Sequence, residues 1–335
     1  MSIRLAVIGA GVMGADHARI FAEKIPGVTL QVVCDADVKR AKTVADQTGA
    51  SNMSQDPEGT IQRADVDAVL IASPDHTHAA LTNACIASNK PVLCEKPLSQ
   101  STGECLQVIE AEQKAQKKLV IVGFMRRFDQ SYVEMKTALD NGQLGRALMM
   151  HNLHRNVETP HADFTGAMAI TNSAPHEFDV ARYVLGSEYQ SVTAYQPRRS
   201  DKVVAPVMMV LETAQGQLVT IEINNNAAYG YDVRAELVGE AGSISMNNVA
   251  YSRLDKKLTS STAYDEDWRG RYAEAYRRQN AAFVDFIQTG KFPADAADSW
   301  DGYCAAVVAE AGVRALESGA KQPVEMQPVP DFYRR

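Results

Sequence analysis

The sequence has little of what would tie it to nucleic acid or to a membrane. Its 34 lysine and arginine residues are outnumbered by 41 acidic residues, which leaves a net charge of −7, whereas nucleic-acid binding requires a basic surface. No apolar run approaches the ~18 residues of a membrane span. The opening residues MSIRLAVIGAG lead directly into a glycine-rich turn, so we expect no signal peptide. We therefore expect neither nucleic acid nor a membrane as a partner.

Cysteine is scarce, and histidine is not clustered. The five cysteines are odd in number, scattered and without a CxxC pair, which favours reduced thiols in a cytoplasmic protein. Histidine pairs occur in DHTH (75–78) and HNLH (151–154), but neither has a third ligand cluster beside it and the chain has no HExxH. We therefore expect no metal site.

A glycine-rich turn stands near the start of the chain. The run IRLAVIG (3–9) predicts a buried strand, ADHARIFAEK (15–24) predicts a helix, and GAGVMG joins them with G-x-G-x-x-G spacing. In this context the first glycine permits the tight turn, the second admits a pyrophosphate, and the third lets the helix pack on the strand. The pattern favours a dinucleotide site over a glycine turn that binds nothing, and its residues are Gly9, Gly11, Val12, Met13 and Gly14.

An acidic residue follows at the distance that such a site requires. The run LQVVCD (30–35) predicts a second strand ending in Asp35, roughly 20 residues after Gly14. A carboxylate there binds the adenosine ribose hydroxyls and repels a 2′-phosphate, so we expect NAD rather than NADP as the cofactor. Lys39 and Arg40 are near enough to weaken this preference, although they also suit the exposed face of the next helix.

Strands and helices continue to alternate up to residue 124. Strands are predicted at 67–73, 91–96 and 118–124, a loop and helix at 74–88, and a helix at 102–116. This alternation predicts an α/β fold with a doubly wound parallel sheet, in which ligands bind at the carboxyl ends of the strands. The residues at such ends are Ser73, Pro74, Glu95, Lys96 and Pro97.

Three motifs in order, GAGVMG, CEKP and GFMRRFD, resemble the glucose–fructose oxidoreductase / inositol dehydrogenase family (Gfo/Idh/MocA). Later segments are similar to its inositol 2-dehydrogenase branch, and the resemblance covers nearly the whole chain. These segments are HRN (154–156), HEFDVARYVLG (176–186), YGYDVRAELVGEAGSI (229–244) and SWDGYCAAV (299–307).

The resemblance implies two domains: an NAD-binding Rossmann domain, 1–124, and a substrate-binding and oligomerisation α+β domain, 125–335. The second domain would carry a large, mostly antiparallel sheet with helices on one face, and its other face would pair subunits, usually into a homotetramer. The sequence agrees, because strand-like runs occur at 147–156, 191–197, 205–213, 216–226, 231–240 and 242–248. Amphipathic helices are predicted at 267–290 and 299–319.

The resemblance also implies the catalytic residues of an alcohol oxidation. His176 matches the family's catalytic base, Lys96 matches its catalytic lysine, and His78 lies in a loop that lines the nicotinamide. Histidine titrates near neutral pH without help, and a lysine stabilises developing alkoxide charge. From the residues alone, His176 could instead be a helix-start histidine bonded to backbone, and Lys96 a solvated residue at a strand exit.

One residue departs from the family pattern. The family usually has an aspartate four residues before the histidine, where this chain has Asn172. An amide can orient an imidazole but carries no charge, whereas a carboxylate nearby shifts its pKa. The departure is compatible with a tolerated variation, with another substrate, or with weak activity.

Several polar residues match the family's substrate site. A ring of hydroxyls needs many donors and acceptors, and such a site rejects analogues that leave its groups unpaired. Other roles are open from the sequence: a surface ion pair for Arg127, sheet packing for Tyr231, and turns for His154 and Asn156. The full candidate set is Arg127, His154, Asn156, Asn172, His176, Tyr231 and Tyr276.

The function that follows is NAD-dependent oxidation of a cyclic polyol, first of all myo-inositol to a 2-keto product. A dehydrogenase of another sugar, an anhydrosugar or scyllo-inositol is the alternative that Asn172 keeps open. A dinucleotide-binding sensor without turnover is a third reading, which the presence of both Lys96 and His176 disfavours.

Overall fold

A computed structural model describes residues 2–199, 203–247 and 252–334, and the chain forms two compact units. The first comprises Met1–Phe128, Glu274–Ala306 and Gln327–Arg335, and the second Asp129–Ala273 and Val307–Met326. This grouping differs from the continuous domains 1–124 and 125–335 that we expected, since later stretches of the chain return to the first unit. The continuous division stays a prediction.

The first unit contains the predicted doubly wound parallel sheet. Its strand order is β3-β2-β1-β4-β5-β6, and every pairing is parallel. The strands β1, β4, β5 and β6 are almost fully buried, as expected for a sheet covered on both faces. The strands are β1 (Ile3–Ile8), β2 (Val28–Cys34), β3 (Asn52–Ser54), β4 (Ala68–Ile71), β5 (Val92–Cys94) and β6 (Val120–Val122).

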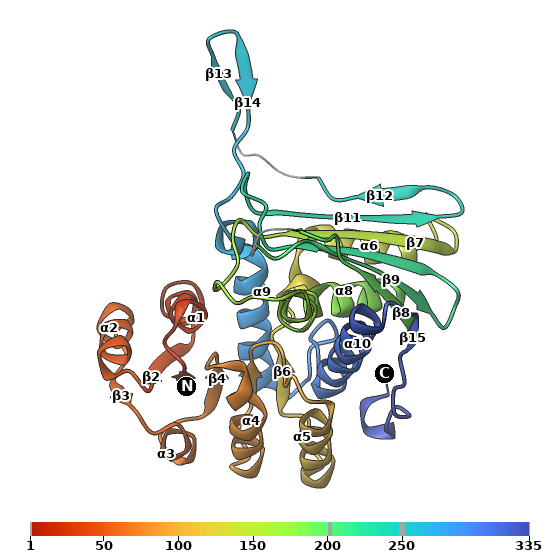
Figure 1. Ribbon diagram of the computed structural model, residues 1–335. Helices are drawn as coiled ribbons and strands as arrows, with labels where there is room; N and C mark the ends of the chain where they lie inside the picture. Colours follow the sequence, from red (N-terminus) through yellow and green to blue (C-terminus); the bar gives the residue numbers. More distant parts are fainter. Residues whose placement is uncertain (1, 200–202, 248–251, 335) are drawn as a thin grey trace. The chain divides into compact units, whose positions relative to one another are not determined.

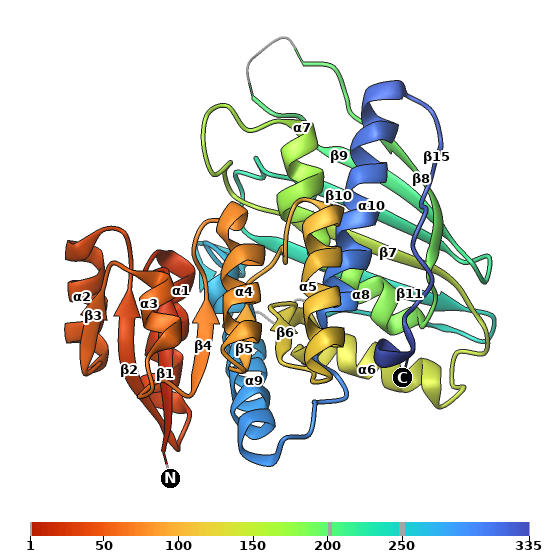
Figure 2. The same ribbon diagram turned by 90° about the horizontal axis from the view of Figure 1, so that it is seen from below.

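Helices cover both faces of this sheet. In Figures 1 and 2, α1 and α2 lie on one face, and α3, α4 and α5 lie on the other. Side chains begin several of them: the Asp37 carboxylate accepts the amides of Lys39 and Arg40 at the start of α2, and Ser101 caps α5. The helices are α1 (Val12–Lys24), α2 (Val38–Thr48), α3 (Pro57–Gln62), α4 (His78–Ala87) and α5 (Thr102–Ala115), with short turns η1 (Asp75–Thr77) and η2 (Met125–Phe128).

Residues far along the chain complete this unit. They include parts of α9 (Trp268–Thr289) and α10 (Ser299–Ser318), and the turn η4 (Asp331–Tyr333). Ala297 bridges Val122 at the edge of β6. The buried carboxylate of Glu112 accepts hydrogen bonds from the backbone amides of Leu119 and Val120, at the start of β6. It also accepts the hydroxyls of Ser299 (2.6 Å) and Tyr333 (2.7 Å). Burial nevertheless raises the pKa of Glu112.

The second unit is built on a seven-stranded sheet in the order β12-β11-β7-β10-β9-β8-β15. Within this sheet, the β10–β7 pair is parallel and the other pairs of described strands are antiparallel, which confirms a mostly antiparallel sheet. Within the expected strand 242–248, the structure forms the shorter strand β12. The last expected residue, Asn248, lies outside the described residues. The strands are β7 (Ala147–Arg155), β8 (Tyr189–Tyr195), β9 (Val207–Thr213), β10 (Leu218–Asn224), β11 (Asp232–Gly239), β12 (Ser243–Ser245) and β15 (Gln322–Pro323).

Helices cover one face of this second sheet. α6 (Gln130–Asp140) and α8 (Pro175–Leu185) pack together, and α8 packs on β7 (Figure 1). Burial alternates along β9 and β10, so that Val219, Ile221 and Ile223 are buried while the residues between them are partly exposed. The short helix α7 (Gly166–Met168) and the π-helical turn η3 (Ala169–Ser173) lead into α8.

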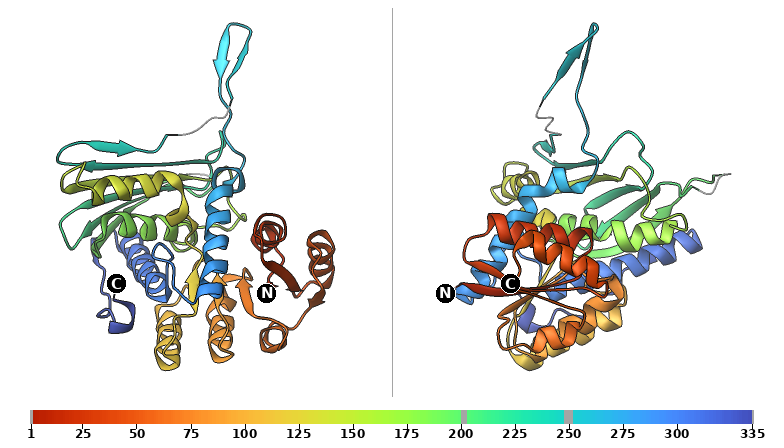
Figure 3. Two further views of the ribbon diagram at one scale, coloured as in Figure 1. Left: turned by 180° about the vertical axis from the view of Figure 1, so that it is seen from behind. Right: turned by 90° about the vertical axis from the view of Figure 1, so that its left-hand side faces the viewer.

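A hairpin stands clear of the seven-stranded sheet, as Figures 1 and 3 show. It consists of β13 (Leu254–Lys256) and β14 (Thr259–Ser261), and all its residues are exposed. Among the described residues, no helix is both long enough and apolar enough to cross a membrane.

Candidate active site

The three glycines of the predicted dinucleotide motif have different physical reasons to be glycine. Gly9 has a φ of +93°, and a Cβ there would lie 2.4 Å from the Ala72 carbonyl oxygen. A Cβ on Gly14 would lie 1.7 Å from the Gly9 carbonyl oxygen. A Cβ on Gly11 would meet no atom within 4 Å. Gly9 and Gly14 therefore serve the fold, while Gly11 leaves an open approach to the backbone.

The start of α1 and the end of β2 frame this opening. No side chain caps α1, so its first amides are available to an anion. Val12, the first residue of α1, is exposed, and Met13 follows it. Asp35 lies just beyond β2, as predicted. These features fit a dinucleotide, whose pyrophosphate would lie at Gly11 and whose adenosine ribose would lie at Asp35.

Asp35 has three partners. Its carboxylate accepts the amide of Ala10 (2.7 Å) and that of Asp37 (2.8 Å), and it forms an ion pair with Arg40 (2.8 Å). Although burial opposes the charged form, the Arg40 guanidinium and the two amides lower the pKa of Asp35. Asp35 is therefore ionised at neutral pH, as ribose binding requires.

The carboxyl ends of β4 and β5 are adjacent, and the predicted cofactor residues follow them. The strands stop earlier than expected, at Ile71 and Cys94, so that Lys96 lies in the loop after β5 rather than at its last position. The Glu95 carboxylate accepts the Lys96 amide (3.1 Å), and the Lys96–Pro97 bond is cis. The structure thus brings Ser73, Pro74, His78, Glu95, Lys96 and Pro97 to one sheet edge.

In the second unit, His176 is the second residue of α8. Pro175 opens this helix, and no side chain caps it. The His176 side chain is buried. Asn172 lies one turn earlier, in η3, where its side-chain oxygen accepts the Thr171 hydroxyl (2.9 Å). Single π-helical turns are rare and often occur at functional sites.

A buried contact between a histidine and a carboxylate lies beside this helix start. The Nδ1 atom of His154 on β7 is 3.2 Å from Oε2 of Glu177, the residue after His176, and both side chains are buried. The Tyr231 ring meets the His154 ring edge to face at 6.0 Å. Asn156 instead makes a backbone turn, donating to Asn224 and accepting from Ala227. Glu177 was not predicted from the sequence, where an acidic residue in a first helical turn suggests only a favourable dipole interaction.

Two further predicted substrate residues lie in the first unit. Arg127 is fully buried and pairs with Asp301 (3.1 Å), so its ion pair is not on the surface. Tyr276, on α9, packs its ring against the buried His17 of α1 at 5.4 Å. Lys96 also lies in the first unit, whereas His154, Asn156, Asn172, His176 and Tyr231 lie in the second.

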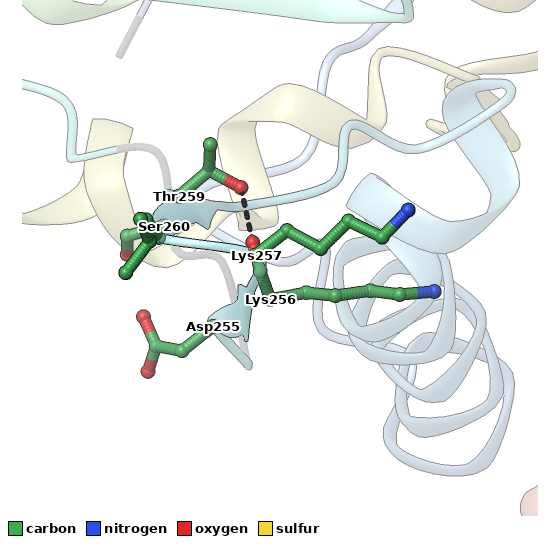
Figure 4. A pocket seen from close by; sticks show the side chains of 6 residues that line it. Asp255, Lys256, Lys257, Thr259 and Ser260 are labelled. Atoms are coloured by element: carbon green, nitrogen blue, oxygen red, sulfur yellow. Dashed lines mark hydrogen bonds between the residues drawn. The ribbon is translucent and has the colours of Figure 1, made fainter.

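Two other kinds of ligand site, a metal cluster and a surface hollow, have little support in the described residues. Within residues 2–199, 203–247 and 252–334, no three His, Cys, Asp or Glu side chains are arranged to hold a metal ion. A hollow of about 410 Å³ lies on the exposed β13–β14 hairpin and is lined only by residues 255–260. Figure 4 shows the side chains of Lys256 and Lys257 extending in the same direction, and the Thr259 hydroxyl donates to the Lys256 carbonyl (2.6 Å). With no buried polar group, this hollow lacks the character of a ligand site.

Two family models match the chain. Residues 3–124 match the Gfo/Idh/MocA oxidoreductase family with its NAD-binding Rossmann fold, and residues 132–245 match the Gfo/Idh/MocA C-terminal domain. The chain is 44% identical to inositol 2-dehydrogenase 1 of Saccharopolyspora erythraea over 338 residues, which cover 99% of each protein. It is 37% identical to the inositol 2-dehydrogenase of Klebsiella pneumoniae over 342 residues, all of both chains.

A solved structure agrees with these relatives. The crystal structure of myo-inositol dehydrogenase from Lactobacillus casei, in complex with NAD(H) and myo-inositol, superposes with a TM-score of 0.94 at 28% identity and covers 100% of both chains. The glycine turn, Asp35 and the parallel sheet fit the same cofactor. The chain therefore belongs to the inositol 2-dehydrogenase branch of the Gfo/Idh/MocA family and is an NAD-dependent dehydrogenase.

Proposed function

We propose that this dehydrogenase oxidises a cyclic polyol, and that its substrate is myo-inositol, which becomes 2-keto-myo-inositol (scyllo-inosose). Relatives matched over their full length carry the name inositol 2-dehydrogenase. The observation that carries the proposal on this chain is the buried group of polar side chains at the start of α8. His154, Glu177 and Tyr231 lie together there beside His176, and a polyol site needs such convergent donors and acceptors.

In the proposed reaction, His176 takes the proton of the substrate hydroxyl and Lys96 donates a hydrogen bond to the same oxygen. As the carbonyl forms, the Lys96 ammonium stabilises the negative charge that develops on this oxygen. When bound, NAD supplies the acceptor for the hydride that leaves the carbinol carbon. The balanced result is a ketone, NADH and one proton, which His176 passes to solvent. Both residues must therefore reach one hydroxyl.

A substrate panel tests the proposal. NADH formation is followed with myo-inositol, scyllo-inositol, D-glucose, D-xylose, L-glucose and levoglucosan, each with NAD and with NADP, and the product is identified by NMR. We expect the highest kcat/KM with myo-inositol and NAD. His176→Ala and Lys96→Ala should each lower kcat by about 10²–10⁴-fold, whereas the control His161→Ala, an exposed histidine of the same unit as His176, should not.

A different polyol or sugar is the second candidate, and Asn172 is the observation that favours it. The family resemblance implies a carboxylate at this position, whereas the amide of Asn172 presents both a donor and an acceptor to a substrate hydroxyl. A preference for scyllo-inositol, a sugar or levoglucosan in the same panel would replace myo-inositol and keep the enzyme class.

We also propose that the open face of the second sheet pairs subunits into a homotetramer. Cross-strand neighbours on this face form a row of apolar and charged side chains, with Met208 40% and Tyr195 57% exposed. The row is Tyr195, Met208, Glu222, Leu153 and Arg234. Light scattering should give four times the chain mass, and Met208→Asp should lower this measured mass.

We further propose a cytoplasmic location for the protein. The five cysteines are buried and form no disulfides, which supports this proposal.

A further inference from the structure

Two buried histidines hold the chain on either side of Lys96. His78, the first residue of α4, places Nδ1 2.7 Å from the Pro97 carbonyl oxygen and Nε2 2.8 Å from the Ser73 carbonyl oxygen. Both partners are backbone carbonyls, which only accept hydrogen bonds. The ring must therefore carry a proton on each nitrogen to make both bonds, and it is an imidazolium.

The surroundings of His78 support this charge. Although burial opposes it, the neighbouring Cys94 and the two carbonyls raise the pKa of His78 to about 10. The imidazolium ties the residue after Lys96 to the chain that follows β4. The loops after two adjacent parallel strands are thereby joined by one side chain, which is only 1% exposed.

His17 acts from the other side through Glu95. The Nε2 atom of His17 lies 2.9 Å from one Glu95 oxygen, and the other Glu95 oxygen accepts the Lys96 amide (3.1 Å). A carboxylate accepts only, so Nε2 carries the proton. Asn280 on α9 holds the opposite ring nitrogen of His17 at 3.0 Å.

The space around Glu95 is closed as well. Both His17 and Glu95 are buried, and the Tyr276 ring packs edge-on against the His17 ring. A Cβ on Gly123 would lie 2.9 Å from the Glu95 carboxyl carbon. The Glu95 carboxylate therefore lies in a closed environment, in which each of its oxygens has a hydrogen-bond partner.

We infer that His17 and His78 are positioning residues that fix the backbone before and after Lys96 and so aim its ammonium at the reacting oxygen. The inference rests on the proposed role of Lys96. Both ring nitrogens of each histidine are bonded to protein atoms. We therefore expect each histidine to influence the reaction through the position of Lys96. A misplacement of about 1 Å in a reacting group can lower a rate on the order of 10²-fold, so a loosened loop should show in kcat.

The first test compares His17→Leu, which removes the donor to Glu95, with His17→Gln, whose amide keeps one. We expect kcat to fall roughly 10²-fold in His17→Leu and to recover largely in His17→Gln, with the Kd of NADH little changed in both. Ile61→Ala, a fully buried change in α3, is the control for lost stability and should keep its kcat. The inference would be overturned if kcat fell equally in His17→Leu and His17→Gln. It would also be overturned if the affinity for NADH fell as much as kcat.

The second test is a double-mutant cycle between His78→Gln and Lys96→Ala, followed in single turnovers. If His78 acts through Lys96, His78→Gln lowers kcat in the wild type but not in the Lys96→Ala enzyme. Equal effects in both backgrounds would overturn the inference and leave the role of Lys96 intact. A wild-type kcat in Lys96→Ala would instead overturn the proposed catalytic role itself.

A third measurement needs no turnover. Hydrogen exchange of the segment 93–99 should be faster in His17→Leu and in His78→Gln than in the wild type, while the exchange of β1 stays unchanged. Unchanged exchange in 93–99 would contradict the positioning role even if kcat fell.

Discussion

The guanidinium of Arg40 makes two hydrogen bonds to the carboxylate of Asp35. Nη2 lies 2.8 Å from Oδ1 and Nε lies 3.1 Å from Oδ2. Asp35 is buried, whereas half of the Arg40 side chain is exposed. Two-pronged pairs of this kind are stronger than single contacts. The carboxylate that should bind the adenosine ribose therefore has a cation attached to it, on the side that solvent reaches.

Arg40→Ala should sharpen the preference for NAD over NADP. Without the guanidinium, the Asp35 charge is uncompensated and repels a 2′-phosphate more strongly. We expect kcat/KM for NADP to fall on the order of 10-fold, about 1.4 kcal/mol, and kcat/KM for NAD to change less. Lys39→Ala is the matched control, because Lys39 is exposed and adjacent in sequence. An equal fall for both cofactors would show that Arg40 acts only on the shape of the turn.

The glycine motif should separate folding from cofactor binding. Gly11→Ala adds a Cβ where no atom lies within 4 Å, so the melting temperature should stay near that of the wild type. The same Cβ blocks the approach of a pyrophosphate, and we expect the Kd of NADH to rise about 10-fold or more. Gly14→Ala is the contrasting variant, since its Cβ would meet the Gly9 carbonyl oxygen. Thermal unfolding and NADH fluorescence titration measure the two effects, and a large loss of stability in Gly11→Ala would contradict this division.

Asn172→Asp should move the pH dependence of oxidation. A carboxylate one helical turn before His176 favours the protonated imidazole, which cannot take the substrate proton. We expect the acidic limb of the kcat/KM profile to shift to higher pH by about 1 unit or more. Thr171→Val, which removes the hydroxyl bonded to Asn172, is a control for local packing. An unchanged profile and substrate preference would show that this position is outside the proton path.

The free energy of unfolding should depend on pH because His78 is charged in the folded protein. The folded pKa is about 10 against an ordinary value of 6.5, so folding favours the proton. This contribution is fully present below about pH 6.5 and is lost as the pH rises toward 10. The free energy of unfolding of the wild type should therefore fall by up to about 1.4 kcal/mol per pH unit in that range, and less steeply in His78→Gln. Urea unfolding at several pH values measures both slopes. Cys94 interacts with His78 and raises its pKa, so Cys94→Ala is a control that removes this neighbour and keeps the imidazole. Parallel slopes in wild type and His78→Gln would contradict an imidazolium at this position.

Local sequence patterns were sufficient for the core of the first unit. The strand, glycine turn and helix from Ile3 to Lys24 are set by neighbouring residues, and the same is true of the strands that deliver Asp35 and Lys96. The strand β3 was missed because it has three residues, is largely exposed and lies at the edge of the sheet beside β2. The bridge between Val122 and Ala297 joins distant parts of the chain and leaves no periodic signal. The division of the chain into compact units was for this reason beyond the sequence.

The candidate site shows the same limit. Glycines, a strand-end acid and a strand-end lysine are recognisable because the motif itself defines their place. His17 lies 78 residues from Glu95, and His154 lies 23 residues from Glu177, so neither pair can be read from spacing. The turn η3 is π-helical, so its period differs from the α-helical period that is used to recognise helices in a sequence. The partners of the candidate residues, rather than the residues themselves, required the structure.

The return of the chain to its first unit has a consequence for synthesis. When the first 128 residues have left the ribosome, the buried carboxylate of Glu112 still lacks two of its four donors, Ser299 and Tyr333. The outer edge of β6 also lacks Ala297. The unit that begins first is therefore completed last, after the entire second unit has been made. A nascent chain of this protein has to keep an unfinished sheet edge from pairing elsewhere for most of its translation.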